Sequence, residues 1–179
     1  MTLASRLVHL CLFHACWIAC VAGAGHGWPA LGPVLVLTLT PLHLMWRGGS
    51  PGEAAYLGAA ALLGYGADSA LVLAGALRFP EYASLGQPSP FWMVALWVAF
   101  AATLPVSMAW LGRRSVLAVS AGAIAGPLSY QAGVALGALE WGSRPAQGVM
   151  AVAVEWALCL PLLLWLSRTC HNGGRVTRT

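Results

Sequence analysis

The chain has 179 residues, of which 59% are hydrophobic and 8% are charged, whereas a soluble domain carries about 25% charged residues. Its mean hydropathy of +0.76 and its five acidic residues exclude a soluble domain, a secreted disulfide scaffold and a disordered tail. All nine basic residues are arginines scattered along the chain, which indicates membrane orientation and no nucleic-acid partner. The expected partner is the lipid bilayer.

Six apolar runs approach or exceed the length of about 20 residues that a helix needs to cross hydrocarbon. These expected spans cover residues 7–24, 28–45, 54–77, 91–111, 116–138 and 149–166. Short breaks rich in Gly, Pro, Ser and charge separate them, which is typical of turns. The sequence therefore predicts an all-α integral membrane protein, a six-transmembrane-helix bundle with short loops. It forms a single membrane domain over residues 1–179 that ends in a basic tail at 167–179.

The arginines orient this bundle. With a cytoplasmic N-terminus, two arginines, Arg78 and Arg144, fall outside and seven fall inside. The seven are Arg6, Arg47, Arg113, Arg114, Arg168, Arg175 and Arg178. An excess of arginine on one side is typical of the cytoplasmic face, so both termini are expected in the cytoplasm, with the basic tail.

The first run has one alternative interpretation. It ends in small residues, at 21–24, as a signal peptide does before its cleavage site. Only Arg6 precedes the apolar stretch, and His9 and His14 interrupt it. Cleavage would also leave five spans, so we expect a membrane helix here.

The fifth span carries two small-residue motifs, Gly122-x-x-x-Gly126 and Gly133-x-x-x-Gly137, with Pro127 between them. A spacing of four places each pair on one helix face, where another backbone can approach closely. Contact within the bundle is the favoured interpretation, and a homo-oligomer through this span is the alternative. Prolines inside the spans tend to kink helices and point to a bundle with an internal cavity.

Few ionisable residues lie at membrane depth, so each is a candidate functional residue. At about 1.5 Å of rise per residue, Asp68, Tyr130, Gln131 and Glu155 all fall in the outer half of the bilayer. We expect them to form one polar layer that joins the third, fifth and sixth spans. No arginine lies within a span to neutralise the carboxyls, so one of them is expected to be neutral and to act as a donor. This layer would relay protons, hold a polar head group, or act only as a hydrogen-bonded link between helices.

His9, Cys16 and Cys20 fall on one face of the first span and have the side chains of a zinc or copper site. Seven residues of helix span about 10 Å, so one straight helix cannot wrap a metal with them. We therefore expect no metal and no cofactor.

Familiar catalytic motifs are absent from the sequence: it has no GxSxG, no HExxH and no phosphate-binding loop. This lowers the expectation of an enzyme but leaves it open, because membrane enzymes need not carry these motifs.

Several stretches, such as residues 17–24, 66–69 and 96–104, together with Gly126-Pro-Leu-Ser-Tyr-Gln-Ala-Gly133, resemble the domain-of-unknown-function family DUF2878. The resemblance covers about residues 7–166. It implies an uncharacterised bacterial inner-membrane protein and suggests genes near those for fatty-acid cyclopropanation and light stress. The family pattern singles out Asp68, Ser107, Gly126, Pro127 and Tyr130.

Three functions follow as hypotheses. The first is a non-enzymatic accessory in membrane-lipid modification or envelope stress. The second is a small proton-coupled transporter or channel subunit that uses Asp68 and Glu155. The third is an intramembrane lipid-modifying enzyme.

Overall fold

The computed structural model describes residues 3–47 and 49–176. The side chains of residues 3–6, 43, 46, 47 and 171–176 lie outside the described residues. The side chains of four of the seven expected inner arginines, Arg6, Arg47, Arg175 and Arg178, are therefore not described.

The described chain is built from six long helices and four short elements. The helices are α1 (Leu3–Gly25), α2 (Leu31–Arg47), α3 (Pro51–Leu73), α4 (Phe91–Ser107), α5 (Ser115–Ala135) and α6 (Pro145–Val176). The short elements are strands β1 (Leu77–Arg78) and β2 (Glu140–Trp141) and the 3-10 turns η1 (Glu81–Ala83) and η2 (Leu111–Arg113). The all-α fold expected from the sequence is confirmed.

Within the described residues, three helices contain stretches long and apolar enough to cross a membrane: Leu7–Gly25, Pro51–Leu73 and Pro145–Cys170. Shorter apolar stretches, Leu31–Leu42 and Phe91–Ser107, lie in α2 and α4. Long apolar helices with few charges are typical of membrane proteins, and the chain is one by this measure. In α5, glycine and serine residues and the pair Tyr130–Gln131 dilute the apolar character.

Several helices end earlier than the hydropathy pattern predicts. The third span was expected to reach Leu77, but α3 ends at Leu73, and Gly75 turns the chain with φ of +71°. The fifth was expected to reach Ala138, but α5 ends at Ala135 before Gly137, with φ of +76°. Glycine adopts such left-handed turns without steric cost. The apolar residues that follow each of these helices therefore belong to the connection and not to the membrane span.

The fourth span was expected to reach Leu111, but α4 ends at Ser107, and Leu111 opens the 3-10 turn η2. Pro105 lies in its last turn. The first turn of α3 shows the opposite difference, because this helix begins at Pro51, where Ser50 accepts a hydrogen bond from the backbone N–H of Glu53 at 3.2 Å. Serine at this position satisfies a free amide and starts the helix early.

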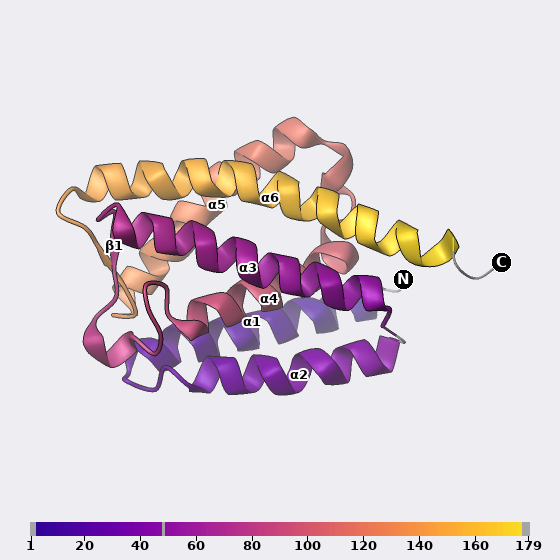
Figure 1. Ribbon diagram of the computed structural model, residues 1–179, viewed down its shortest axis with the longest axis horizontal. Coiled ribbons are helices and arrows are strands. Elements are labelled where there is room, and N and C mark those ends of the chain that lie inside the picture. The colour runs from indigo at the N-terminus through magenta and orange to yellow at the C-terminus, as the bar shows by residue number, and fades with distance from the viewer. Residues whose placement is uncertain (1–2, 48, 177–179) are drawn as a thin grey trace.

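The helices run back and forth, so that α1 begins and α6 ends at the same end of the molecule (Figure 1). We call this the terminal end; η2 lies there against α6. At the opposite end, here called the β end, β1 and β2 pair antiparallel and join the α3–α4 connection to the α5–α6 connection. Helix α4 packs against α1, α2 and α3, while α5 packs chiefly against α6.

Trp92 shows how the β end is held. It lies at the start of α4, where a tryptophan often faces the membrane interface, but it is fully buried. Its Nε1 donates a hydrogen bond to the carbonyl oxygen of Ala83 at 2.9 Å, and its ring meets Phe79 edge to face. The α3–α4 connection folds back over the helix end, which sequence position alone does not indicate.

Candidate functional site

A buried carboxyl at the centre of the bundle joins three helices. Asp68 of α3 is fully buried. The Nε1 of Trp97 on α4 donates a hydrogen bond to Asp68 Oδ2 at 2.7 Å, and the hydroxyl of Tyr130 on α5 donates one to Oδ1. Both carboxyl oxygens therefore have a donor, as a buried carboxyl requires.

Gly64, one turn before Asp68, makes this arrangement sterically possible. A Cβ atom at Gly64 would lie 2.1 Å from Cγ of Trp97, so any other residue would displace the indole. The ring therefore lies directly on the backbone of α3, and its N–H reaches the carboxyl one turn further along.

A second carboxyl lies beside the first. Glu155 of α6 is 9% exposed, and in the described part of the chain neither of its buried oxygens has a hydrogen-bond partner. It lies within electrostatic range of Asp68 and Tyr130. We call Asp68, Trp97, Tyr130 and Glu155 the acid cluster.

Gln131, which the sequence places in the same polar layer, lies elsewhere. Its Oε1 accepts a hydrogen bond from Trp141 Nε1 at 2.8 Å on the exposed surface of the β end. Neighbouring helical residues point about 100° apart, so Tyr130 and Gln131 cannot face the same helix. The structure thus brings together Asp68, Tyr130 and Glu155 and places Gln131 apart.

A cavity of about 720 Å³ borders the acid cluster and opens between α1, α4, α5 and α6. Trp97 and Tyr130 belong to its wall as well as to the cluster. The rest of the wall is largely aromatic and aliphatic, and includes Phe100 and Trp156. Ser107, which the family pattern singles out, also lines it, and its buried Oγ has no partner among the described residues. We call this space the main cavity.

The packing of α5 produces the main cavity. A Cβ atom on Gly122 would lie 2.2 Å from the carbonyl oxygen of Trp156, and one on Gly126 would lie 2.5 Å from Trp156 Cγ. These two glycines therefore hold α5 tightly against α6 of the same chain. A second copy would have to contact α5 through another face, such as that of the exposed residues Ile124 and Leu128.

In the part of the chain that the structure describes, α5 contacts α1 towards the β end. There Trp17 Nε1 donates a hydrogen bond to Ser129 Oγ at 3.1 Å, and a Cβ atom on Gly25 would lie 2.0 Å from the carbonyl oxygen of Leu136. Towards the terminal end the main cavity separates the two helices, and α5 crosses the bundle obliquely (Figure 1).

The second small-residue motif does not form one helix face. Gly133 packs near Leu139, but Gly137 lies beyond the end of α5, where Tyr82 donates a hydrogen bond to its carbonyl oxygen at 2.8 Å. The spacing predicts a helical pair only if the helix continues, and α5 stops two residues too early. Pro127 lies inside α5, next to Gly126.

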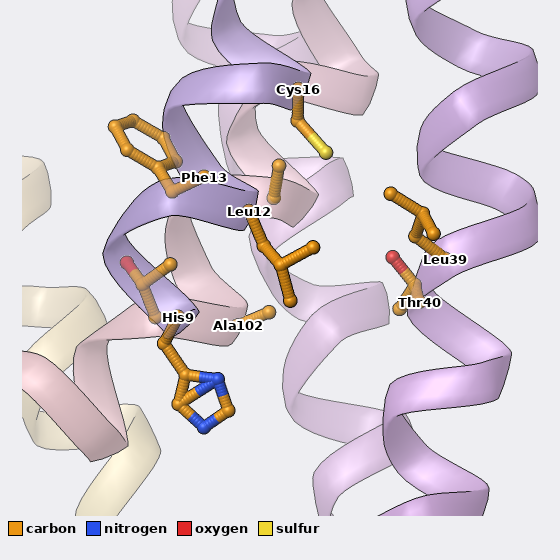
Figure 2. Close-up of a pocket in the computed structure, with 9 residues that line it drawn as sticks. His9, Leu12, Phe13, Cys16, Leu39, Thr40 and Ala102 are labelled. Atoms are coloured by element: carbon orange, nitrogen blue, oxygen red, sulfur yellow. The ribbon is translucent and has the colours of Figure 1, made fainter. Parts of the chain in front are cut away.

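A second cavity, of about 50 Å³, lies between α1, α2 and α4. Figure 2 shows Leu12 and Cys16 of α1 facing Leu39 and Thr40 of α2, with His9 at one edge. Its volume admits a water molecule or two but no chain.

The expected face of His9, Cys16 and Cys20 is buried but divided. Cys20 lies against α2, where a Cβ atom on Gly32 would be 2.4 Å from its Sγ, while His9 and Cys16 line the small cavity. Among the described residues, no group of three His, Cys, Asp or Glu side chains could hold a metal ion.

Comparison with known proteins identifies the family. A family model described as "Protein of unknown function (DUF2878)" matches residues 6–162. The chain belongs to this family. No curated protein and no solved structure matches it.

The part that tryptophan plays at this site was not evident from the amino-acid sequence. Trp97 donates to Asp68 and stacks on Trp156, with ring centroids 4.6 Å apart and planes 16° apart. Both indoles line the main cavity. One signal was available: Trp97 lies six residues inside the fourth run, deeper than the run's ends, where the membrane interface accounts for a tryptophan.

Proposed function

We propose that this protein is a six-span, multi-pass protein of the bacterial inner membrane with both termini in the cytoplasm, and that it binds a lipid chain in the main cavity. Its role is that of a non-enzymatic accessory in membrane-lipid modification or envelope stress. The six-span topology is supported by the alternating run of the helices and by the arginine distribution. A reporter fused after Thr179 that is active only in the periplasm would overturn the orientation.

The main cavity is the observation that carries the binding function. Its volume of about 720 Å³ lies within the range of about 300–1,000 Å³ typical of small-molecule sites. Its wall is apolar and rich in aromatic side chains, and its helices are those expected to lie in hydrocarbon. An apolar space of this kind is best filled by an apolar chain, and the acyl chains of the surrounding bilayer are the nearest source.

The test is to fill the main cavity from its own wall. Ala125 of α5 lines it, so Ala125→Trp places an indole where the chain would lie. Ala70 of α3 is exposed and lines neither cavity, which makes Ala70→Trp the matched control. Native mass spectrometry of the purified protein should show at least a fivefold loss of retained lipid for the first variant and none for the second. Equal retention by both variants would overturn the binding function.

The acid cluster supports one alternative, a lipid-modifying enzyme. The Tyr130 hydroxyl donates a hydrogen bond to Asp68, and Tyr130 also lines the main cavity. The side chain of Tyr130 therefore connects the Asp68 carboxyl to the space that the bound molecule would occupy. Asp68→Asn, compared with a deletion strain, separates the candidates. An altered fatty-acid profile in both strains favours the enzyme, and one in the deletion strain alone favours the accessory. Loss of pH-dependent flux with an unchanged profile favours the proton-coupled transporter.

A further inference from the structure

Three arginines gather at the terminal end beside the main cavity. Arg113 ends η2, and Arg114 directly precedes α5; both are exposed. Arg168 of α6 is also exposed and reaches the same turn, because a Cβ atom on Gly112 would lie 3.4 Å from its Nε. The fold thus brings together residues that are more than fifty positions apart in the sequence.

The same turn forms the rim of the main cavity. Met108, Trp110 and Leu111 line the cavity at this end, and Leu111 belongs to the turn that carries Arg113. Trp110 is 56% exposed, so the rim is open to the surroundings of the helices. The α4–α5 connection, residues 108–114, contains no acidic residue.

From this juxtaposition we infer that the ligand is an anionic phospholipid, with its phosphate on Arg113, Arg114 and Arg168 and one acyl chain in the main cavity. This inference rests on the proposed function, because it assumes that a lipid chain fills the cavity. Guanidinium groups bind phosphate through paired charge-assisted hydrogen bonds. Basic pockets between membrane helices are typical sites for anionic head groups.

The main cavity is long enough for an acyl chain. Its lining extends along α4 from Ser107 to Met93, fourteen residues or about 21 Å of helix. The hydrocarbon core is about 30 Å thick, so this distance exceeds the thickness of one leaflet. The far end of the chain meets Tyr130 and the acid cluster, while the phosphate stays at the rim. The described wall of the main cavity contains no arginine, which favours this orientation over the reverse.

The experiment compares lipids that differ only in head-group charge. Delipidated protein in neutral detergent is titrated with phosphatidylglycerol or with phosphatidylcholine of identical chains, and bound lipid is counted by native mass spectrometry. We expect the wild type to bind phosphatidylglycerol about tenfold more tightly, a preference that weakens at high salt. The triple variant Arg113→Gln/Arg114→Gln/Arg168→Gln should bind both lipids alike. The control Arg78→Gln/Arg144→Gln, with two arginines from the β end, should keep the preference.

Each outcome has one interpretation. Equal binding of the two lipids by the wild type overturns the assignment of an anionic lipid but leaves the binding function in place. Failure of both lipids to bind the wild type overturns the proposed function itself. Inorganic phosphate that displaces the lipid completely would show that the arginines bind a free anion and that the cavity adds nothing. Should the triple variant fail to fold, the salt dependence of the wild-type preference still decides, because a preference unchanged by salt contradicts the arginine site.

Discussion

The two ends of this molecule are held together in different ways. At the β end, connections far apart in the sequence are joined by strand pairing and by side-chain bonds, such as Tyr82 to Gly137 and Trp92 to Ala83. At the terminal end, α1 and α5 are separated by the main cavity, whose rim carries the arginines of η2 and α6. One end is therefore closed by specific polar contacts, and the other is open to its surroundings.

The difference indicates which parts serve stability and which serve binding. Closure of the β end fixes where α5 meets α1, and the tight contact of α5 with α6 fixes its inclination. Because these two contacts fix the direction of α5, α5 diverges from α1 towards the terminal end. The acid cluster lies between the two ends, at the inner wall of the cavity. Four predictions test this division.

The largest effect is expected at the α5–α6 contact. In Gly122→Ala the added Cβ atom meets the backbone oxygen of Trp156 at 2.2 Å, and a backbone atom cannot turn away. We expect the free energy of unfolding to fall by about 3 kcal/mol. A Cβ atom on Gly66 of α3 meets nothing within 4 Å, so Gly66→Ala should stabilise the protein by about 0.5–1 kcal/mol. Thermal unfolding in detergent compares the two, and equal losses would contradict the tight contact.

The next effect is expected in the acid cluster. Tyr130→Phe removes the donor to Asp68 Oδ1 and leaves a buried carboxyl oxygen without a partner, which should cost about 2 kcal/mol. Tyr65 donates to the carbonyl oxygen of Gln87 at 2.7 Å on the exposed surface. Tyr65→Phe is therefore the matched control and should cost less than about 1 kcal/mol. A smaller loss for Tyr130→Phe than for its control would show that the cluster contributes little to the fold.

A direct comparison of the two ends uses tryptophan. Trp92→Phe at the β end removes the bond to the buried carbonyl of Ala83, and we expect a loss of about 1.5 kcal/mol. Trp110→Phe at the terminal end alters a ring that is 56% exposed, and the change should stay within about 0.5 kcal/mol. Denaturant titration of both variants measures the difference. Losses of equal size would mean that the two ends are equally constrained.

The smallest effect is expected for Gln131. Its bond to Trp141 lies on the exposed surface, so Gln131→Ala should lower the free energy of unfolding by about 0.5 kcal/mol. Lipid retention should not change, because Gln131 borders neither cavity. A loss of retained lipid comparable to that of Ala125→Trp would show that Gln131 does contribute to lipid binding.

Most of the fold was predictable, because long apolar runs in a chain with 8% charge have helices as their favoured structure in hydrocarbon. Helix ends were less predictable: Gly75 and Gly137 turn the chain within apolar sequence, so hydropathy alone extends α3 and α5 too far. Of the polar residues, Asp68 and Tyr130 were identifiable from their rarity at membrane depth. The position of Gln131 was not, because depth along a helix does not specify direction around it.

The sequence by itself determined the helical class, the membrane character and the positions of the rare carboxyls. These properties depend on composition and on local order along the chain. Only the tertiary structure decided that Trp97 binds Asp68, that Arg168 joins Arg113 and Arg114, and that a cavity of about 720 Å³ lies between α1 and α5. The physical reason is that each of these features depends on how helices distant in the sequence pack against one another. That packing is set by close contacts, such as those of Gly64 with Trp97 and of Gly122 with Trp156, which no local pattern specifies.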